Sequence, residues 1–332
     1  MLQVHIQGSQ MAKRNEHYIP QFLLRGFCGE TGLVHCFDKR TGRPYAASTR
    51  NIASEKGFYD VELDSGKTIN FEVCFTRLEE AAAPVIERIR KTGQLVISAD
   101  ERVSLACYLA AQMVRTPKHR KMIAAFGREL ATKFGDVGEV MDSEAKARSA
   151  LFDVFSQIEE FSPHLCNKDW LLLRAPPGWS FLLGDDPVVL QNTSNPSSLH
   201  RGTLGIGVDG IEIYHPLSPD LCLSLNCKSI GEIVRGGILK HEFLRQMGLD
   251  LPFTEGTRFS HEYVNRLATG TPLQMSKDNV DNVNFMQCFQ SARFIFSANG
   301  DFTFIKDCLS RGDVSLGSPG IMLNWKVIGE GD

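Results

Sequence analysis

The hydrophobic pattern of the chain changes near residue 69, and this change constrains the fold more than any other feature. Residues 33–38 and 57–61 follow a period of about two, which predicts short strands. Residues 69–91 repeat apolar side chains every three or four positions, which predicts a helix. A chain that carries both patterns is expected to have an α+β fold.

Helical signals dominate the rest of the first half. Ser98 and Glu101 have the spacing of a capping box, so we expect a helix to begin there. Apolar side chains continue at helical spacing to Val114, and Pro117 should end or kink this helix. We also expect a short helix from Pro20 that stops at Gly26, and longer helices over residues 120–133 and 144–161.

The second half mixes both patterns. Residues 169–174 and 179–183 are predicted to be neighbouring strands across a Pro-Pro-Gly turn, and 192–203 to be a polar loop. Further strands are expected over 211–214, 221–225 and 292–297, and further helices over 258–267 and 278–291. We therefore predict one α+β domain over residues 11–332. In it, a helical layer from the first half packs against a mixed or antiparallel sheet. Residues 1–10 are predicted to be a mobile N-terminal extension.

Charge and cysteine content narrow the environment. The chain has 36 basic and 39 acidic residues, so its net charge of −3 gives no overall attraction to nucleic acid or acidic membranes. No segment reaches the roughly 18–20 apolar residues of a membrane span, and no signal peptide is evident. The nine cysteines are widely spaced and form no C-x-x-C pair, which argues against disulfides and thiolate zinc sites. We expect a cytoplasmic protein.

Residues 205–210 match the pattern G-x-G-x-x-G. A dinucleotide site needs a strand before this pattern and a helix after it. Here a polar loop precedes it and a strand follows, so nucleotide binding is disfavoured.

Three groups of polar residues have both a functional and a structural interpretation. Glu72 and Glu79 share one helix face and could bind a divalent cation, or could form an exposed stripe. Gln112 and Arg115 could hold a phosphate or carboxylate, or lie at a solvated helix end. Asp185 follows an apolar run and could belong to a site or to a turn.

Several motifs together resemble the domain-of-unknown-function family 4238. The segment from His17 to Phe27 is similar to that family's opening "HYVPQ-x-x-L-R-x-F", and residues 54–59 to its "aEk-x-FY" step. Gln112 and Arg115-Thr116-Pro117 match "Q-x-x-RTP". Gly184-Asp185-Asp186-Pro187 matches "SDNP", with Gly184 in place of the usual serine and Asp186 in place of asparagine. The resemblance covers about residues 15–300. It groups seven polar residues as candidates for a shared site: His17, Gln21, Lys56, Glu79, Gln112, Arg115 and Asp185.

These residue types suggest a metal-dependent phosphodiester hydrolase, such as a nuclease of a bacterial defence or toxin system. Glu79 and Asp185 would hold Mg²⁺ or Mn²⁺, and His17 would be the general base. Lys56 and Arg115 would neutralise phosphate charge on a nucleic acid or another phosphate-bearing ligand.

The alternative is a non-enzymatic anion-binding or sensing module. In that case the same residues form a structural polar network that ties the N-terminal helix to the core. The two hypotheses differ in whether the motif residues meet in a solvent-reachable cleft or in a dry interior. The sequence leaves the oligomeric state open.

Overall fold

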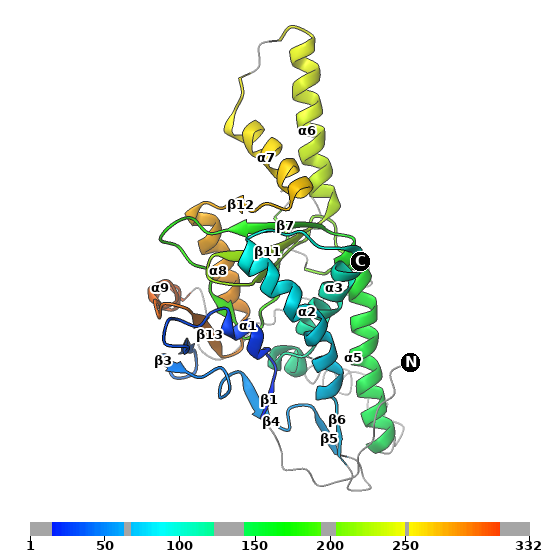
Figure 1. Cartoon of the computed structure of the whole chain (residues 1–332), viewed down its shortest axis with the longest axis vertical. Helices are drawn as coiled ribbons and strands as arrows, with labels where there is room; N and C mark the ends of the chain where they lie inside the picture. The colour runs from blue at the N-terminus through cyan, green and yellow to red at the C-terminus, as the bar shows by residue number, and fades with distance from the viewer. Residues whose placement is uncertain (1–14, 63–67, 123–142, 194–203, 250–251, 313–332) are drawn as a thin grey trace, which may run out of the picture.

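The computed structural model describes residues 15–62, 68–122, 143–193, 204–249 and 252–312 (Figure 1). Two larger sheets, two small two-stranded sheets and a layer of helices make up this part of the chain. The predicted α+β class is confirmed. Residues 1–10, most of the predicted helix over 120–133 and most of the predicted loop over 192–203 lie outside the described residues.

The first sheet has five strands in the order β12-β7-β11-β10-β9. Its one parallel pair joins β12 to β7, so the sheet is mixed. Leu172 of β7 packs into the largest hydrophobic cluster, whereas its neighbours Leu171 and Leu173 pack into a second cluster on the other face. Both faces are covered, which explains why these strands are continuous apolar runs. The bounds are β7 Asp169–Arg174, β9 Val189–Gln191, β10 Glu212–Pro216, β11 Leu221–Asn226 and β12 Leu273–Gln274.

The second sheet is antiparallel, with the order β3-β2-β13-β8, and it joins the two ends of the described chain. Its strands are β2 Val34–Asp38, β3 Arg43–Ala47, β8 Leu183–Gly184 and β13 Phe294–Ser297. The predicted pairing of 179–183 with 169–174 is wrong, because β8 pairs with β13. Side chains from α8 hold this segment instead: Asn284 accepts the N–H of Leu182 at 2.7 Å, and Gln287 accepts that of Gly184 at 2.7 Å.

Two further sheets each consist of one short antiparallel strand pair. Strand β1 (Asn15–His17) pairs with β4 (Ser54–Lys56), and β5 (Asp60–Glu62) pairs with β6 (Thr68–Asn70). The strand predicted over 57–61 is therefore shifted: Gly57 has φ +63°, and residues 57–59 form a turn between β4 and β5.

The helical layer consists of α2 (Glu72–Thr92), α3 (Ala99–Val114) and α5 (Ser143–Cys166), which lie side by side in Figure 1. The capping box at the start of α3 is present, with both of its hydrogen bonds. Helix α3 ends before Pro117, and residues 117–122 begin a new helical segment. The short predicted helix is α1 (Gln21–Arg25). It stops at Gly26, whose φ of −66° is not left-handed, so its termination has another cause.

A two-helix arm projects from the body (Figure 1). It is formed by α6 (Lys228–Gln246) and α7 (Glu255–Thr269). The sequence pattern did not predict α6. The remaining helices, α8 (Lys277–Gln290) and α9 (Thr303–Ser310), pack with the four-stranded sheet around a third apolar cluster.

Candidate functional site

A cleft of about 390 Å³ lies between the N-terminal segment and α2. Four of the seven candidate residues line it: His17, Gln21, Glu79 and Arg115. One face of α2 supplies much of its wall, and this face carries Glu72 and Glu79 together, as their spacing predicts. The other described lining residues are Phe22, Arg25, Tyr59, Phe75, Thr76, Glu80 and Ala83.

His17 ends strand β1 and is held from two sides. Its Nε2 lies 3.0 Å from the carbonyl oxygen of Thr49, and its own carbonyl accepts the Tyr59 hydroxyl at 3.1 Å. Because a carbonyl can only accept, Nε2 carries the proton and Nδ1 keeps the lone pair. Burial lowers the pKa of this imidazole, so His17 is neutral at pH 7.

Arg115 follows the last residue of α3, and its guanidinium is almost completely buried. Its Nη1 donates to Glu79 at 2.6 Å, while Nε and Nη2 donate to the side-chain oxygen of Gln112 at 3.1 and 2.7 Å. Gln112 in turn donates to the carbonyl of Tyr18 at 2.8 Å. This network fastens the junction of β1 and α1 to α2 and α3.

The two residues proposed as metal ligands are placed differently. Glu79 lines the cleft, but Asp185 is buried in the interior and is not one of the lining residues. Its carboxylate accepts the backbone N–H groups of Ala292, Arg293 and Phe294 at 2.6, 2.8 and 2.9 Å. Burial nevertheless raises its pKa to about 6, because the three donors only partly offset the desolvation of the charge. In the described part of the chain, no three His, Cys, Asp or Glu side chains are grouped so as to hold a metal ion.

Lys56 lies apart from the other candidates. It is exposed on β4, opposite Asn15, and does not line the cleft. Asp186, next to Asp185, forms an ion pair with Lys118 at 3.1 Å. Lys118, directly after the "RTP" motif, therefore joins it to the "SDNP" motif, and both Lys118 and Asp186 line a pocket other than the cleft.

Sequence reasoning missed the buried polar residues that support this region. Arg90 of α2 donates to the carbonyls of Phe22 and Leu23 at 2.9 and 3.1 Å, and to that of Leu217 at 2.7 Å. It thereby terminates α1, and its guanidinium occupies the space that a side chain on Gly26 would need. The sequence pattern of α2 does not distinguish Arg90 from its exposed neighbours Arg88 and Lys91.

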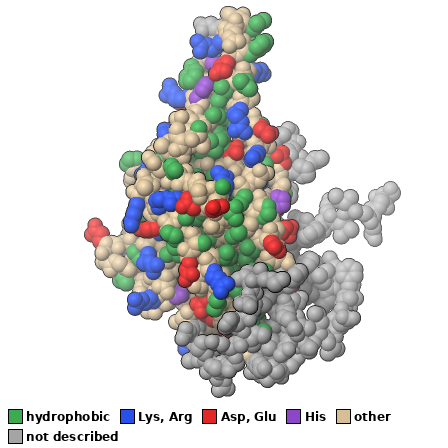
Figure 2. All heavy atoms as spheres, turned by 45° about the vertical axis from the view of Figure 1, so that its right-hand side comes forward, with side chains coloured by type: hydrophobic (Ala, Val, Ile, Leu, Met, Phe, Trp, Pro, Cys, Tyr) green, Lys and Arg blue, Asp and Glu red, His purple; other side chains and the backbone are tan. Residues whose placement is uncertain are grey.

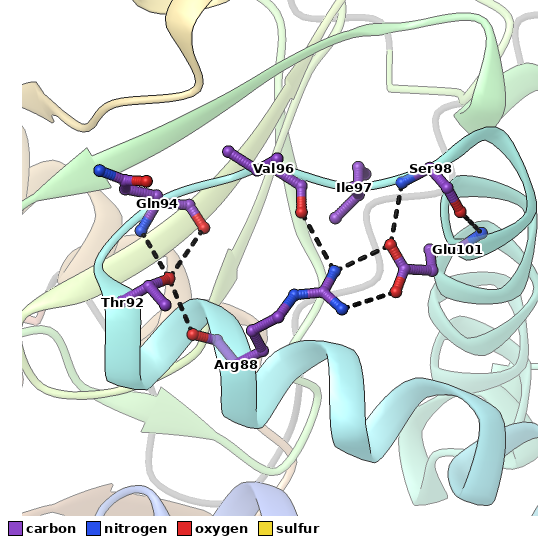
Figure 3. Close-up of a pocket in the computed structure, with 7 residues that line it drawn as sticks. All are labelled: Arg88, Thr92, Gln94, Val96, Ile97, Ser98 and Glu101. Carbon is purple, nitrogen blue, oxygen red and sulfur yellow. Dashed lines mark hydrogen bonds and ion pairs between the residues drawn. The ribbon is translucent and has the colours of Figure 1, made fainter.

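A second hollow lies where α2 joins α3 (Figure 3). Arg88 reaches across it to the carboxylate of Glu101 at 2.7 and 2.8 Å, and also donates to the carbonyl of Val96. Glu101 also accepts the N–H of Ser98, and these contacts lower its pKa to about 2. The polar groups that line this hollow bind one another, so we interpret the hollow as part of the junction between α2 and α3 and not as a binding site.

Comparison with known proteins is consistent with the motif resemblance. A family model described as "Protein of unknown function (DUF4238)" matches residues 15–301. No curated protein and no solved structure matches the chain. Among the described helices, none is long and apolar enough to cross a membrane.

Proposed function

The chain belongs to the DUF4238 family of proteins of unknown function, and we propose that the cleft between α1 and α2 binds a small organic cation. The observation that carries this proposal is the lining itself, which combines three carboxylates of α2 with aromatic rings. The carboxylates are those of Glu72, Glu79 and Glu80, and the rings those of Phe22, Tyr59 and Phe75.

The charge balance favours a cation over an anion. The charge of the Arg115 guanidinium is neutralised by Glu79. Its Nη1 already donates to Glu79, and its Nε and Nη2 already donate to Gln112. His17 adds no charge at pH 7, so the charged lining residues are three carboxylates and the two guanidinium groups of Arg25 and Arg115. A phosphate would have to displace Glu79 to reach Arg115. An ammonium or guanidinium group would instead meet carboxylates and aromatic faces, which attract cations.

The test is titration calorimetry with spermidine and methylguanidinium, with inorganic phosphate at equal ionic strength as the anionic probe. We expect the cations to bind, and Glu80→Gln to weaken their affinity by about fivefold, or roughly 1 kcal/mol. Glu87→Gln is the matched control, because Glu87 is exposed on the same helix and does not line the cleft. Binding of phosphate alone, or equal losses in both variants, would refute the proposal.

A second candidate is a metal-dependent phosphodiester hydrolase acting on nucleic acid or another phosphate-bearing ligand. The geometry of His17 supports it, because a neutral imidazole with its Nε2–H fixed on a carbonyl is suited to act as a general base. Mg²⁺ or Mn²⁺ would need Glu79 together with Glu72, since the carboxylate of Asp185 is engaged by three backbone donors. The cation would lower the pKa of a bound water and offset the negative charge of the cleft.

This candidate is tested by thermal unfolding with Mg²⁺ and Mn²⁺ and by hydrolysis of bis(p-nitrophenyl) phosphate. It predicts a metal-dependent rise of the unfolding midpoint that Glu72→Gln removes. Independently of this candidate, the three backbone donors predict that Asp185→Asn lowers stability whether or not metal is present, because an amide N–H₂ group would face backbone N–H donors. Absence of both the midpoint shift and phosphodiester cleavage would exclude it.

A further inference from the structure

The outward face of α6 is apolar and exposed along the projecting arm. The opposite side of the helix meets α7, where Val234, Ile238 and Leu244 are half-buried. On the outward side, Leu239, Phe243 and Met247 recur at helical spacing and are 65%, 59% and 69% exposed. Figure 2 shows hydrophobic side chains along the arm between charged ones.

Two glycines interrupt α6 at the middle of the arm. A Cβ atom added to Gly236 or Gly237 would meet no described atom within 4 Å, so packing against the described residues does not require either residue to be glycine. Each glycine costs a helix about 1 kcal/mol relative to alanine. Gly236 lies on the same face as Leu239 and Phe243, where the absence of a side chain leaves a notch open to a partner.

We propose that the outward face of α6 associates with the same face of a second copy of this chain, with the two helices antiparallel. The charges on its flank fit this occupant. Arg235 and Glu242 lie on one flank of the face, separated by two helical turns. In an antiparallel pair that crosses near Ile238, Arg235 of each copy lies beside Glu242 of the other.

The same crossing places Leu239 of each copy in the notch at Gly236 of the other, so apolar and charged contacts share one register. A parallel pair in register would instead set Arg235 against Lys240 of the partner, which is repulsive. A twofold axis through the arms also makes the contact closed and self-complementary.

Among the residues that the structure describes, the ion pair of Arg235 is a long one, 3.9 Å from Asp169. It is therefore able to bind a partner carboxylate. Glu242→Arg is the more specific test of the two charge reversals, because Arg235→Glu also places a carboxylate near Asp169.

The test is sedimentation velocity of the full chain over a concentration series. We expect a monomer–dimer equilibrium in wild type, and at least a tenfold weaker association in Glu242→Arg and in Arg235→Glu. Mixing these two variants in equal amounts should restore the dimer, because a carboxylate of one variant then faces a guanidinium of the other at both flanking contacts. Phe243→Glu should abolish association both in wild type and when it is added to the two charge-reversal variants in the mixture.

Arg245→Glu is the matched control, since it reverses a charge of α6 away from this face and should leave association unchanged. Thermal unfolding confirms that each variant is folded before it is compared. Sedimentation as a monomer at every concentration, or no recovery in the mixture, would overturn the proposal. So would binding to phosphatidylglycerol vesicles that Phe243→Glu abolishes without a dimer in solution, because the face would then serve a membrane.

Discussion

Several charged groups in this protein are satisfied by backbone donors and acceptors. The ammonium of Lys39, which is 1% exposed, donates to the carbonyls of Cys288 and Ser291 at 2.9 and 2.8 Å. Asp185 accepts three backbone N–H groups, and Arg90 donates to three carbonyls. Such charges fix loops and helix ends in place, because leaving them unpaired would be costly. The sequence could not reveal this: Lys39 begins a run that reads as an ordinary turn.

His215 is expected to make the fold sensitive to acid. Its ring is fully buried beside Tyr108, and burial lowers its pKa to about 4. The folded state therefore disfavours the protonated ring, which the unfolded chain accepts near pH 6.5. Its contribution to stability is complete above pH 6.5 and is lost as the pH falls toward 4. Urea unfolding should show a loss of about 2 kcal/mol from this residue between pH 7 and pH 5.

The variant His215→Phe isolates this effect from other groups that titrate in the same range. The difference between wild type and variant in the free energy of unfolding should shrink by about that amount at pH 5. His164→Phe is the control, because the side chain of His164 is exposed near the end of α5 and the pH dependence of this variant should match that of wild type. An unchanged difference between pH 7 and pH 5 in His215→Phe would contradict the buried, neutral imidazole.

At the scale of single elements, the sequence predicted those helices whose ends are encoded locally. The capping box at Ser98 set the start of α3, and apolar spacing gave most of α2. Helix α6 was not predicted, because Gly236 and Gly237 weaken its helical pattern of apolar side chains and Cys227 makes no side-chain cap. The strand over 179–183 was paired with the wrong neighbour, since only Asn284 and Gln287, about a hundred residues later, specify where it runs.

The candidate site, like the helices and strands, was predicted only in part from the sequence. The motif resemblance grouped seven residues, and four of them line one cleft. It could not show that Gln112 donates to the carbonyl of Tyr18 or that Asp185 faces backbone amides, because both depend on contacts distant in sequence. The aromatic wall of Phe22, Tyr59 and Phe75 was equally hidden, since these rings look like core residues in the sequence.

Helix α1 is expected to depend on Arg90 for its position. Arg90→Ala would leave the carbonyls of Phe22 and Leu217 without the guanidinium donor and that of Leu23 with the N–H of Gly26 alone, at a cost of about 3 kcal/mol. Gly26→Ala should act in the same direction, because its methyl group would displace the guanidinium. Urea unfolding measures both losses.

Arg88→Ala, which removes an exposed ion pair on the same helix, should cost about 1 kcal/mol or less. Equal losses at Arg90 and Arg88 would show that α1 is held by its apolar contacts alone.

At the scale of the whole molecule, the arm and the body are built differently. The body buries three apolar clusters and covers both faces of its larger sheet. Within the described residues of the arm, the buried side chain is that of Tyr263, near its base, while the distal part is exposed or half-exposed. An extension that buries little adds little to the stability of the body. Its exposed apolar face is therefore available for a contact outside the chain.

Replacing residues 239–260 with a short Gly-Ser turn is expected to leave the body intact. None of the described residues in this stretch is buried, so the unfolding midpoint should change by less than about 4 °C. Tyr263 remains and keeps the base of α7 in its cluster. Because Phe243 and Glu242 are removed, the shortened chain should sediment as a monomer, and its affinity for organic cations at the cleft should match that of wild type. A fall of the midpoint by roughly 10 °C or more would show that the arm belongs to the cooperative core. Retained dimerisation would place the contact between copies on the body instead.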